Sequence, residues 1–89
     1  MTTNKIHKIG RIDQVVRAYF DSNKSIVEIP AKNLMPLFIE KGVFNNDHRN
    51  GLPIRNILRE LDAENKLDLI TNAKVIRSTI NRNWYFKSI

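Results

Sequence analysis

One apolar stripe limits what this chain can fold into more than any other feature. Ile54, Ile57, Leu58 and Leu61 stand at positions i, i+3, i+4 and i+7, which lie on a single face of an α-helix. Such a stripe is typical of a helix that packs against a core and turns its other side to solvent. We therefore predict an amphipathic helix over residues 50–66.

Two shorter helices are expected before it. The first covers residues 11–21, and its apolar face has the same spacing: Ile12, Val15, Val16, Tyr19 and Phe20. The second covers residues 31–41, with Asn33 as its N-cap. Pro36 then falls in the first turn, where a backbone N–H has no intrahelical partner, and Gly42 suits the C-terminal stop.

The segment before these helices has a different character. Residues 1–10 include two lysines and no acid, and Gly10 separates them from the first apolar face. We expect a flexible basic arm here, because chain ends without an apolar anchor are commonly poorly ordered. The remaining residues, 11–89, are few enough to make one domain.

Three short strands complete the expected order. The first is Ser25–Ile29, which is rich in β-branched residues and is placed at the edge of the sheet. The second is Leu67–Ile70, directly after the long helix. Residues 71–82 form a basic connector, and Asn83–Phe86 is the returning strand.

The aromatic residues of the returning strand indicate which side meets the core. Side chains alternate along a strand, so Trp84 and Phe86 share one face, which we take as the core face. Tyr85 then points to the other side. In the connector, the apolar pair at residues 75–76 could lengthen the preceding strand.

This order of helix, strand, helix, helix, strand, wing and strand resembles the winged helix-turn-helix family across residues 11–87. The resemblance implies an α+β fold, with three helices and a small antiparallel sheet. It implies that residues 11–89 form a single winged-helix domain. The chain departs from the simplest pattern at residues 42–50, which are longer than a tight helix-turn-helix turn.

Composition excludes several function classes. The chain has no cysteine, so disulfides, thiolate metal sites and cysteine nucleophiles are ruled out. His7 and His48 are its two histidines, too few for a metal site that needs three or four converging ligands. No catalytic motif is present. No apolar run is long enough for a signal peptide or a membrane span. We expect a soluble cytoplasmic protein that is not an enzyme and needs no cofactor or metal.

A net charge of +6 favours a polyanionic partner. With the apolar stripe buried, Arg55, Asn56 and Arg59 would face outward, and these residue types make bidentate contacts with guanine and adenine edges. The objection is that acids within residues 60–64 cancel the charge of this helix. An ordinary solvated face is the alternative interpretation.

The connector makes a stronger case for phosphate contacts. Lys74, Arg77 and Arg82 lie in a segment without acids. The same segment holds neutral donors suited to phosphate oxygens: Asn72, Ser78, Thr79, Asn81 and Asn83. A charged loop that merely keeps a sheet edge soluble is the alternative.

The sequence therefore predicts a small winged-helix protein that binds double-stranded DNA as a regulator, and we expect it to act as a homodimer. Phosphates would be held by the basic wing, and a groove would be read by the third helix. The rival hypothesis is a protein interaction or homodimerisation module that binds no nucleic acid. The neutral third helix favours the rival, as do the apolar wing residues Val75, Ile76 and Ile80.

Overall fold

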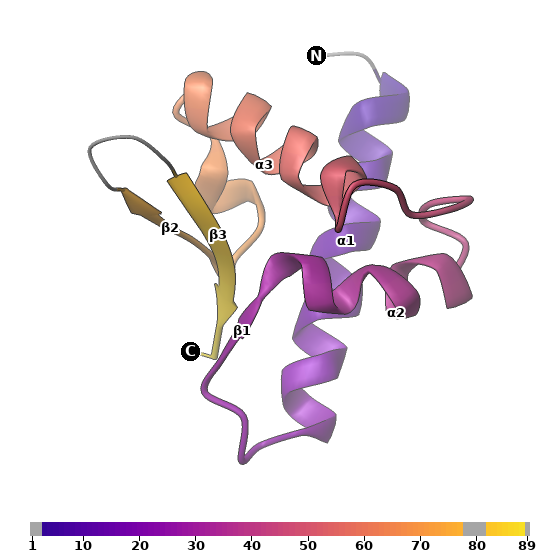
Figure 1. Ribbon diagram of the computed structural model, residues 1–89, viewed down its shortest axis with the longest axis vertical. Helices are drawn as coiled ribbons and strands as arrows, with labels where there is room; N and C mark the ends of the chain where they lie inside the picture. Colours follow the sequence, from indigo (N-terminus) through magenta and orange to yellow (C-terminus); the bar gives the residue numbers. More distant parts are fainter. Residues whose placement is uncertain (1–2, 78–81, 89) are drawn as a thin grey trace.

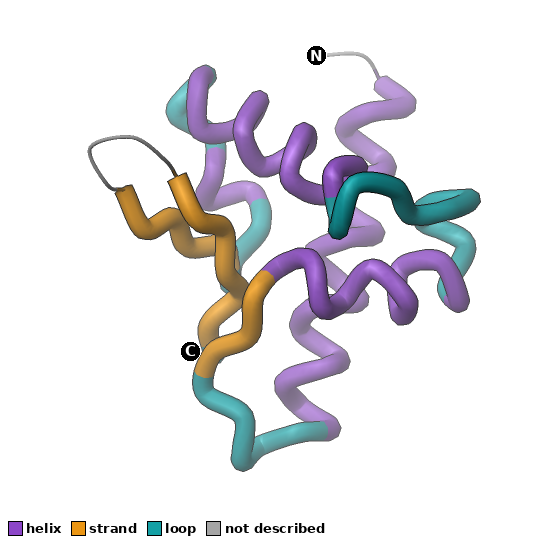
Figure 2. Tube along the Cα trace, viewed as in Figure 1, coloured by secondary structure: helices purple, strands orange, loops and turns teal. Residues whose placement is uncertain are grey.

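The computed structural model describes residues 3–77 and 82–88, of which Arg77 and Arg82 are described by their backbone only. It has three α-helices and a three-stranded antiparallel sheet, which confirms the predicted α+β class and the winged-helix-like order (Figures 1 and 2). The strands gather on one side of the helices. The elements are α1 (Thr3–Ser22), β1 (Glu28–Pro30), the 3₁₀ turn η1 (Ala31–Leu34), α2 (Met35–Glu40), α3 (Leu52–Ala63), the 3₁₀ turn η2 (Leu67–Leu69), β2 (Ala73–Arg77) and β3 (Arg82–Lys87).

Helix α1 begins at Thr3, eight positions before the expected start at Arg11. Residues 3–10, which we expected as a flexible arm, are therefore helical, and this corrects the prediction. The physical reason is that Ile9 continues the apolar face by one turn and is buried in the core. One turn earlier, Lys5 forms an ion pair with Glu60 of α3.

The region expected as a helix over residues 31–41 is divided into η1 and α2. Pro36 lies in the first turn of α2, as expected, but Leu34 occupies the N-cap position and no side chain caps the helix. The predicted Asn33 cap is therefore wrong. Gly42 follows the helix with a positive φ of 75°, and the Val43 amide donates to the Phe38 carbonyl at 2.8 Å. This is the expected glycine stop.

The apolar stripe of α3 behaves as predicted, since all four of its aliphatic residues are buried. The helix is shorter than the predicted span of residues 50–66. Gly51, in the left-handed region, occupies the N-cap position. Asp47 supplies a side-chain acceptor at the N-terminal end of the helix, because its Oδ1 accepts a hydrogen bond from the Gly51 amide at 2.9 Å.

The strand predicted at Leu67–Ile70 is wrong. Residues 67–69 form the 3₁₀ turn η2, and the Ile70 amide donates to the Leu67 carbonyl at 3.1 Å. The partial alternation of apolar and polar residues over 67–70 does not reflect a strand here, because Leu69 is exposed and Ile70 is the residue that enters the core. The strand forms later, as β2, within the segment that we had taken as a connector.

The sheet has the order β1-β3-β2, so β1 is an edge strand as predicted. In β3, Trp84 and Phe86 are buried, which confirms the assigned core face. Phe86 meets Phe38 of α2 edge to face, with 6.2 Å between ring centroids. Tyr85 alternates to the outer face, where Lys74 is its register partner on β2.

Candidate nucleic-acid interface

Asn56 and Arg59 stand on the exposed side of α3, as predicted from the apolar stripe. They are one helical turn apart, and Arg59 Nη1 donates to Asn56 Oδ1 at 2.9 Å. This bond ties the guanidinium to the amide, so both groups are presented together on the surface. Arg55 lies beside them but is half-buried.

Two acids of the predicted helix are paired with lysines. Glu60 forms an ion pair with Lys5 of α1, which places it on the flank that packs against that helix. Just past the C-terminus, Glu64 lies 3.7 Å from Lys66. Arg59 itself forms no ion pair with a carboxylate among the described residues, so its guanidinium is engaged only by Asn56 there.

Arg55 braces the turn that precedes α3. Its Nη2 donates to the carbonyl oxygen of Arg49, six residues earlier in the chain. Its Nε is buried and has no acceptor within the part of the chain that the structure describes. A buried donor left unpaired costs about 1–3 kcal/mol. Arg55 thus holds a charge at the base of the turn with one donor still unsatisfied.

The turn itself is formed by three successive residues with positive φ: Arg49 at 50°, Asn50 at 53° and Gly51 at 85°. Non-glycine residues adopt this region at a cost of about 1–2 kcal/mol each. A Cβ on Gly51 would lie 2.5 Å from Lys32 Cβ and 2.8 Å from Lys32 Cα. Only glycine allows this approach, which brings η1 directly against the turn.

The close approach creates a pocket of about 420 Å³, which we call the basic pocket. Its lining comes from the end of β1, from η1, from the turn before α3, from the first turn of α3 and from β3: Pro30, Lys32, Arg49, Asn50, Arg55, Asn83, Trp84 and Tyr85. Three of these residues are cations and none is an acid. Among the described residues, neither Lys32 nor Arg49 has a carboxylate partner.

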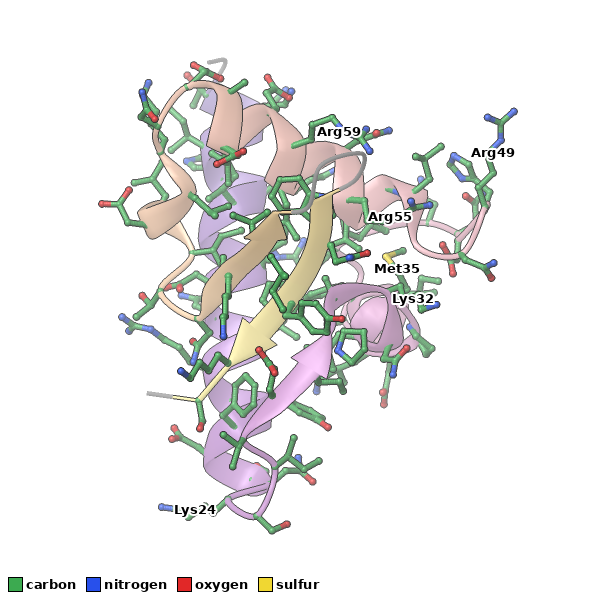
Figure 3. All side chains as sticks on the ribbon, turned by 60° about the vertical axis from the view of Figure 1, so that its left-hand side comes forward. Lys24, Lys32, Met35, Arg49, Arg55 and Arg59 are labelled. Carbon is green, nitrogen blue, oxygen red and sulfur yellow. The ribbon has the colours of Figure 1, made fainter. Side chains whose placement is uncertain are left out.

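Figure 3 shows Arg59, Arg55, Arg49 and Lys32 along one side of the molecule, whereas Lys24 lies at its far end. Sequence reasoning did not find Lys32 or Arg49, since 17 positions separate them and only the Gly51 contact brings them together. The available signal was the run Arg49-Asn50-Gly51 immediately before a proline-containing helix start. Such a run is typical of a left-handed turn.

Of the three cations predicted to hold phosphates in the wing, the structure describes the side chain of Lys74. Lys74 Nζ lies 3.3 Å from Glu28 Oε1 on the outer face of the sheet, so it has an acidic partner. Arg77 and Arg82 are register partners at the end of the β2–β3 hairpin, and their side chains lie outside the described residues, as do residues 78–81.

Asn72 was expected as a surface donor in the wing, and the structure corrects this. The residue is buried, and its Nδ2 donates to the Lys87 carbonyl at 2.8 Å. The Lys87 amide in turn donates to the Asn72 carbonyl at 2.8 Å. Asn72 therefore fastens the start of β2 to the end of β3 and is not available to a phosphate. Asn83, by contrast, is exposed and lines the basic pocket.

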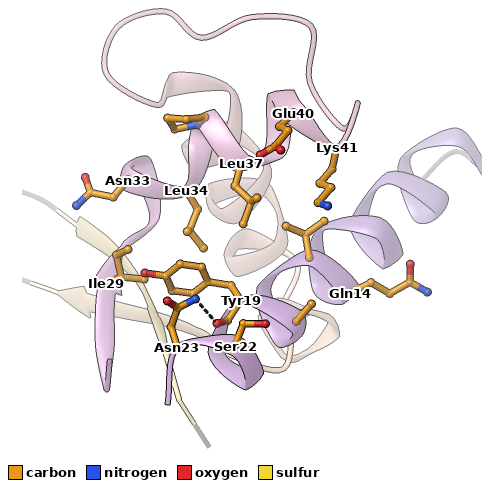
Figure 4. A pocket seen from close by; sticks show the side chains of 13 residues that line it. Gln14, Tyr19, Ser22, Asn23, Ile29, Asn33, Leu34, Leu37, Glu40 and Lys41 are labelled. Atoms are coloured by element: carbon orange, nitrogen blue, oxygen red, sulfur yellow. Dashed lines mark hydrogen bonds between the residues drawn. The ribbon is translucent and has the colours of Figure 1, made fainter. Parts of the chain in front are cut away.

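A second hollow, of about 710 Å³, lies between α1 and α2 (Figure 4). Its floor is largely apolar, with Val15, Tyr19 and Leu37 half-buried there. Asn23 closes one end, where its Nδ2 donates to the Tyr19 carbonyl at 2.8 Å. Its rim carries charges of both signs from Glu40 and Lys41, so it has none of the uniform positive charge of the basic pocket.

Within residues 3–77 and 82–88, no three histidine, aspartate or glutamate side chains are grouped so that they could hold a metal ion. In the same ranges, no helix has the length and apolar character needed to cross a bilayer. No known protein family, curated protein or solved structure matches this chain.

Proposed function

We propose that this chain is a small DNA-binding protein of winged-helix-like layout, acting in the cytoplasm as a regulator. The surface that would bind the duplex is the basic face, which consists of Lys32, Arg49, Arg55, Asn56 and Arg59. One observation carries the proposal. The four cations of this face lie together without carboxylate partners in the described chain, while Glu60 of the same helix is paired with Lys5 on another flank.

The chemistry of the face supports a division of roles. Arg59 and Asn56 stand on the exposed side of α3 and have the donors and acceptors that recognise guanine and adenine edges in a major groove. Lys32 and Arg49 lie at the N-terminal end of α3, where the sugar-phosphate backbone would run beside a helix inserted in the groove. Phosphate neutralisation by these cations would supply most of the affinity.

A charge-reversal comparison tests the proposal. Fluorescence anisotropy with a labelled duplex at about 50 mM salt would compare the parent chain with Arg59→Glu and with Lys24→Glu. Both residues are exposed cations with no carboxylate partner among the described residues. Since a bidentate contact with a base edge is worth about 1–3 kcal/mol, Arg59→Glu should weaken binding by ~10-fold or more. Lys24→Glu, at the far end of the molecule, should change it less than ~3-fold.

Two results would contradict the proposal. One is the absence of duplex binding at low salt in the parent chain. The other is equal weakening by Arg59→Glu and Lys24→Glu, which would indicate only a general attraction between a basic protein and a polyanion. Circular dichroism of each variant would show that the fold is retained.

A protein interaction module is the second candidate. The apolar hollow between α1 and α2 favours it, and so does Ile76, which is 41% exposed on the outer face of the edge strand β2. Val75 packs half-buried against the core, and Ile80 lies outside the described residues. Sedimentation of the parent chain and of Ile76→Lys decides between them. A dimer that Ile76→Lys dissociates, with no duplex binding by either protein, would favour this candidate.

A further inference from the structure

We infer that the basic pocket binds one phosphodiester of the nucleic-acid backbone and thereby fixes the register of α3 on the duplex. This inference rests on the proposed function and names the group that one part of the basic face would hold. Arg59 and Asn56 belong to the exposed side of α3, whereas the pocket joins Arg55, in the first turn of that helix, to the turn before it, η1 and the two strands β1 and β3.

The groups that line the pocket match a phosphate better than any uncharged ligand. Lys32, Arg49 and Arg55 approach it from three different segments of the chain, and no carboxylate contributes to the lining. Asn50 and Asn83 add neutral amide donors beside them. A phosphodiester has one negative charge shared by its two non-bridging oxygens, and these oxygens only accept hydrogen bonds, so a lining rich in donors and cations suits it.

Arg55 gives a second reason to expect an acceptor here. Its Nε is buried without a partner in the described chain, while its Nη2 is already used by the Arg49 carbonyl. Three cations gathered without an anion repel one another, and an entering phosphate would relieve that repulsion. A small rotation of the guanidinium would then give Nε the oxygen that it lacks, which accounts for a donor left unsatisfied in the free protein.

The size of the pocket favours a phosphate within a strand. A volume of about 420 Å³ exceeds what a lone phosphate fills, and it leaves room for the flanking sugars. Tyr85 forms part of the wall, and its ring offers an apolar surface to a deoxyribose. The amides of Gly51 and Leu52 already donate to Asp47 and His48, so the side chains named above would hold the phosphate.

Two contacts hold the walls of the pocket together in the free protein. Gly51 is packed directly against Lys32, and Arg55 fixes the carbonyl of Arg49. Backbone strain concentrated in the three positive-φ residues is the kind that persists where a site is held in one shape. A site that is already formed loses less entropy on binding than a flexible loop, so even a small ligand can be bound.

The single tryptophan of the chain makes the pocket directly observable, because Trp84 is one of its walls. We would titrate the protein at constant ionic strength with thymidylyl-thymidine, which has one phosphodiester, and follow tryptophan emission. Thymidine and inorganic phosphate are the matched probes. The expected result is a saturable change with thymidylyl-thymidine and none with thymidine.

Two exposed lysines provide the matched variants. Lys32→Gln should weaken the thymidylyl-thymidine titration at least fivefold, and Lys24→Gln should leave it unchanged, although both remove one positive charge. Arg49→Gln should behave like Lys32→Gln. The inference is overturned if thymidylyl-thymidine causes no change in emission, or if it titrates Lys32→Gln and Lys24→Gln equally. It is also overturned if inorganic phosphate changes the emission and thymidylyl-thymidine does not.

A duplex experiment gives an independent reading. Single methylphosphonates, which remove one backbone charge at a time, should weaken binding of the parent chain most at one position. At that position, combining the methylphosphonate with Arg49→Gln should weaken binding no more than either change alone. Duplex binding with fully additive losses overturns the pocket inference and leaves the proposed function standing. A saturable titration of the pocket by thymidylyl-thymidine without any duplex binding overturns the proposed function and leaves phosphodiester binding by the pocket standing.

Discussion

Replacing Gly51 by alanine should destabilise the protein more than any other glycine replacement in the chain. Its φ of 85° lies in the left-handed region, which costs a residue with a Cβ about 1–2 kcal/mol. The new Cβ would also lie 2.8 Å from Lys32 Cα, and backbone cannot rotate away as a side chain does. Overpacking of this kind adds about 1–3 kcal/mol. The expected loss is therefore about 2–5 kcal/mol.

Such a loss is large for a chain of this length. At roughly 0.05–0.15 kcal/mol per residue, 89 residues correspond to a free energy of unfolding of about 4–13 kcal/mol. Guanidinium denaturation followed by circular dichroism at 222 nm would measure the difference. The denaturant slope should stay constant, which shows that the native state and not the compactness of the unfolded chain has changed.

Two other glycines separate the causes. Gly42→Ala has a similar φ of 75°, but the nearest atom is Arg11 Nη2 at 3.8 Å, so only the backbone penalty of about 1–2 kcal/mol should remain. Gly10→Ala lies within α1 with open space around it and should stabilise by roughly 0.5–1 kcal/mol. If Gly51→Ala costs no more than Gly42→Ala, then Lys32 does not pack against the turn and the basic pocket has no basis.

Three further substitutions test the packing around the site. Phe38→Ala should cost about 3–5 kcal/mol, because it empties a fully buried ring position, and thermal denaturation would show a large fall in Tm. Asn72→Ala should cost about 1–3 kcal/mol, since it leaves the Lys87 carbonyl without its side-chain donor; chemical denaturation would measure this. Glu28→Gln should change stability by less than about 1 kcal/mol, because its pair with Lys74 is exposed to solvent, and a larger fall in the denaturation midpoint would contradict this.

The apolar periodicity of α3 could be read from the sequence because burial of one helical face requires it. The arm could not be read correctly, since Gly10 and two lysines outweighed the single apolar position Ile9 that the fold buries. The strand predicted at residues 67–70 failed because short apolar runs fit a 3₁₀ turn as well as a strand. Local pattern thus succeeded where many positions agreed and failed where one or two decided.

The candidate site divides in the same way. The exposure of Asn56 and Arg59 follows directly from helical geometry once the buried face is known. The basic pocket does not, because Lys32 meets the turn before α3 only through a tertiary contact at Gly51. Nor does sequence reveal that Lys74 has Glu28 as its partner across the sheet. Contacts between distant segments decide which cations remain available to a ligand.

The salt dependence of duplex affinity tests most directly whether the basic face binds the nucleic-acid backbone. Each phosphate contact contributes about −0.9 to the slope of log affinity against log salt, so removing one contact should make the slope shallower by about one unit. We expect this change for Arg49→Gln and not for Lys24→Gln. Identical slopes for the parent chain, Arg49→Gln and Lys24→Gln would contradict a phosphate-binding role for this surface.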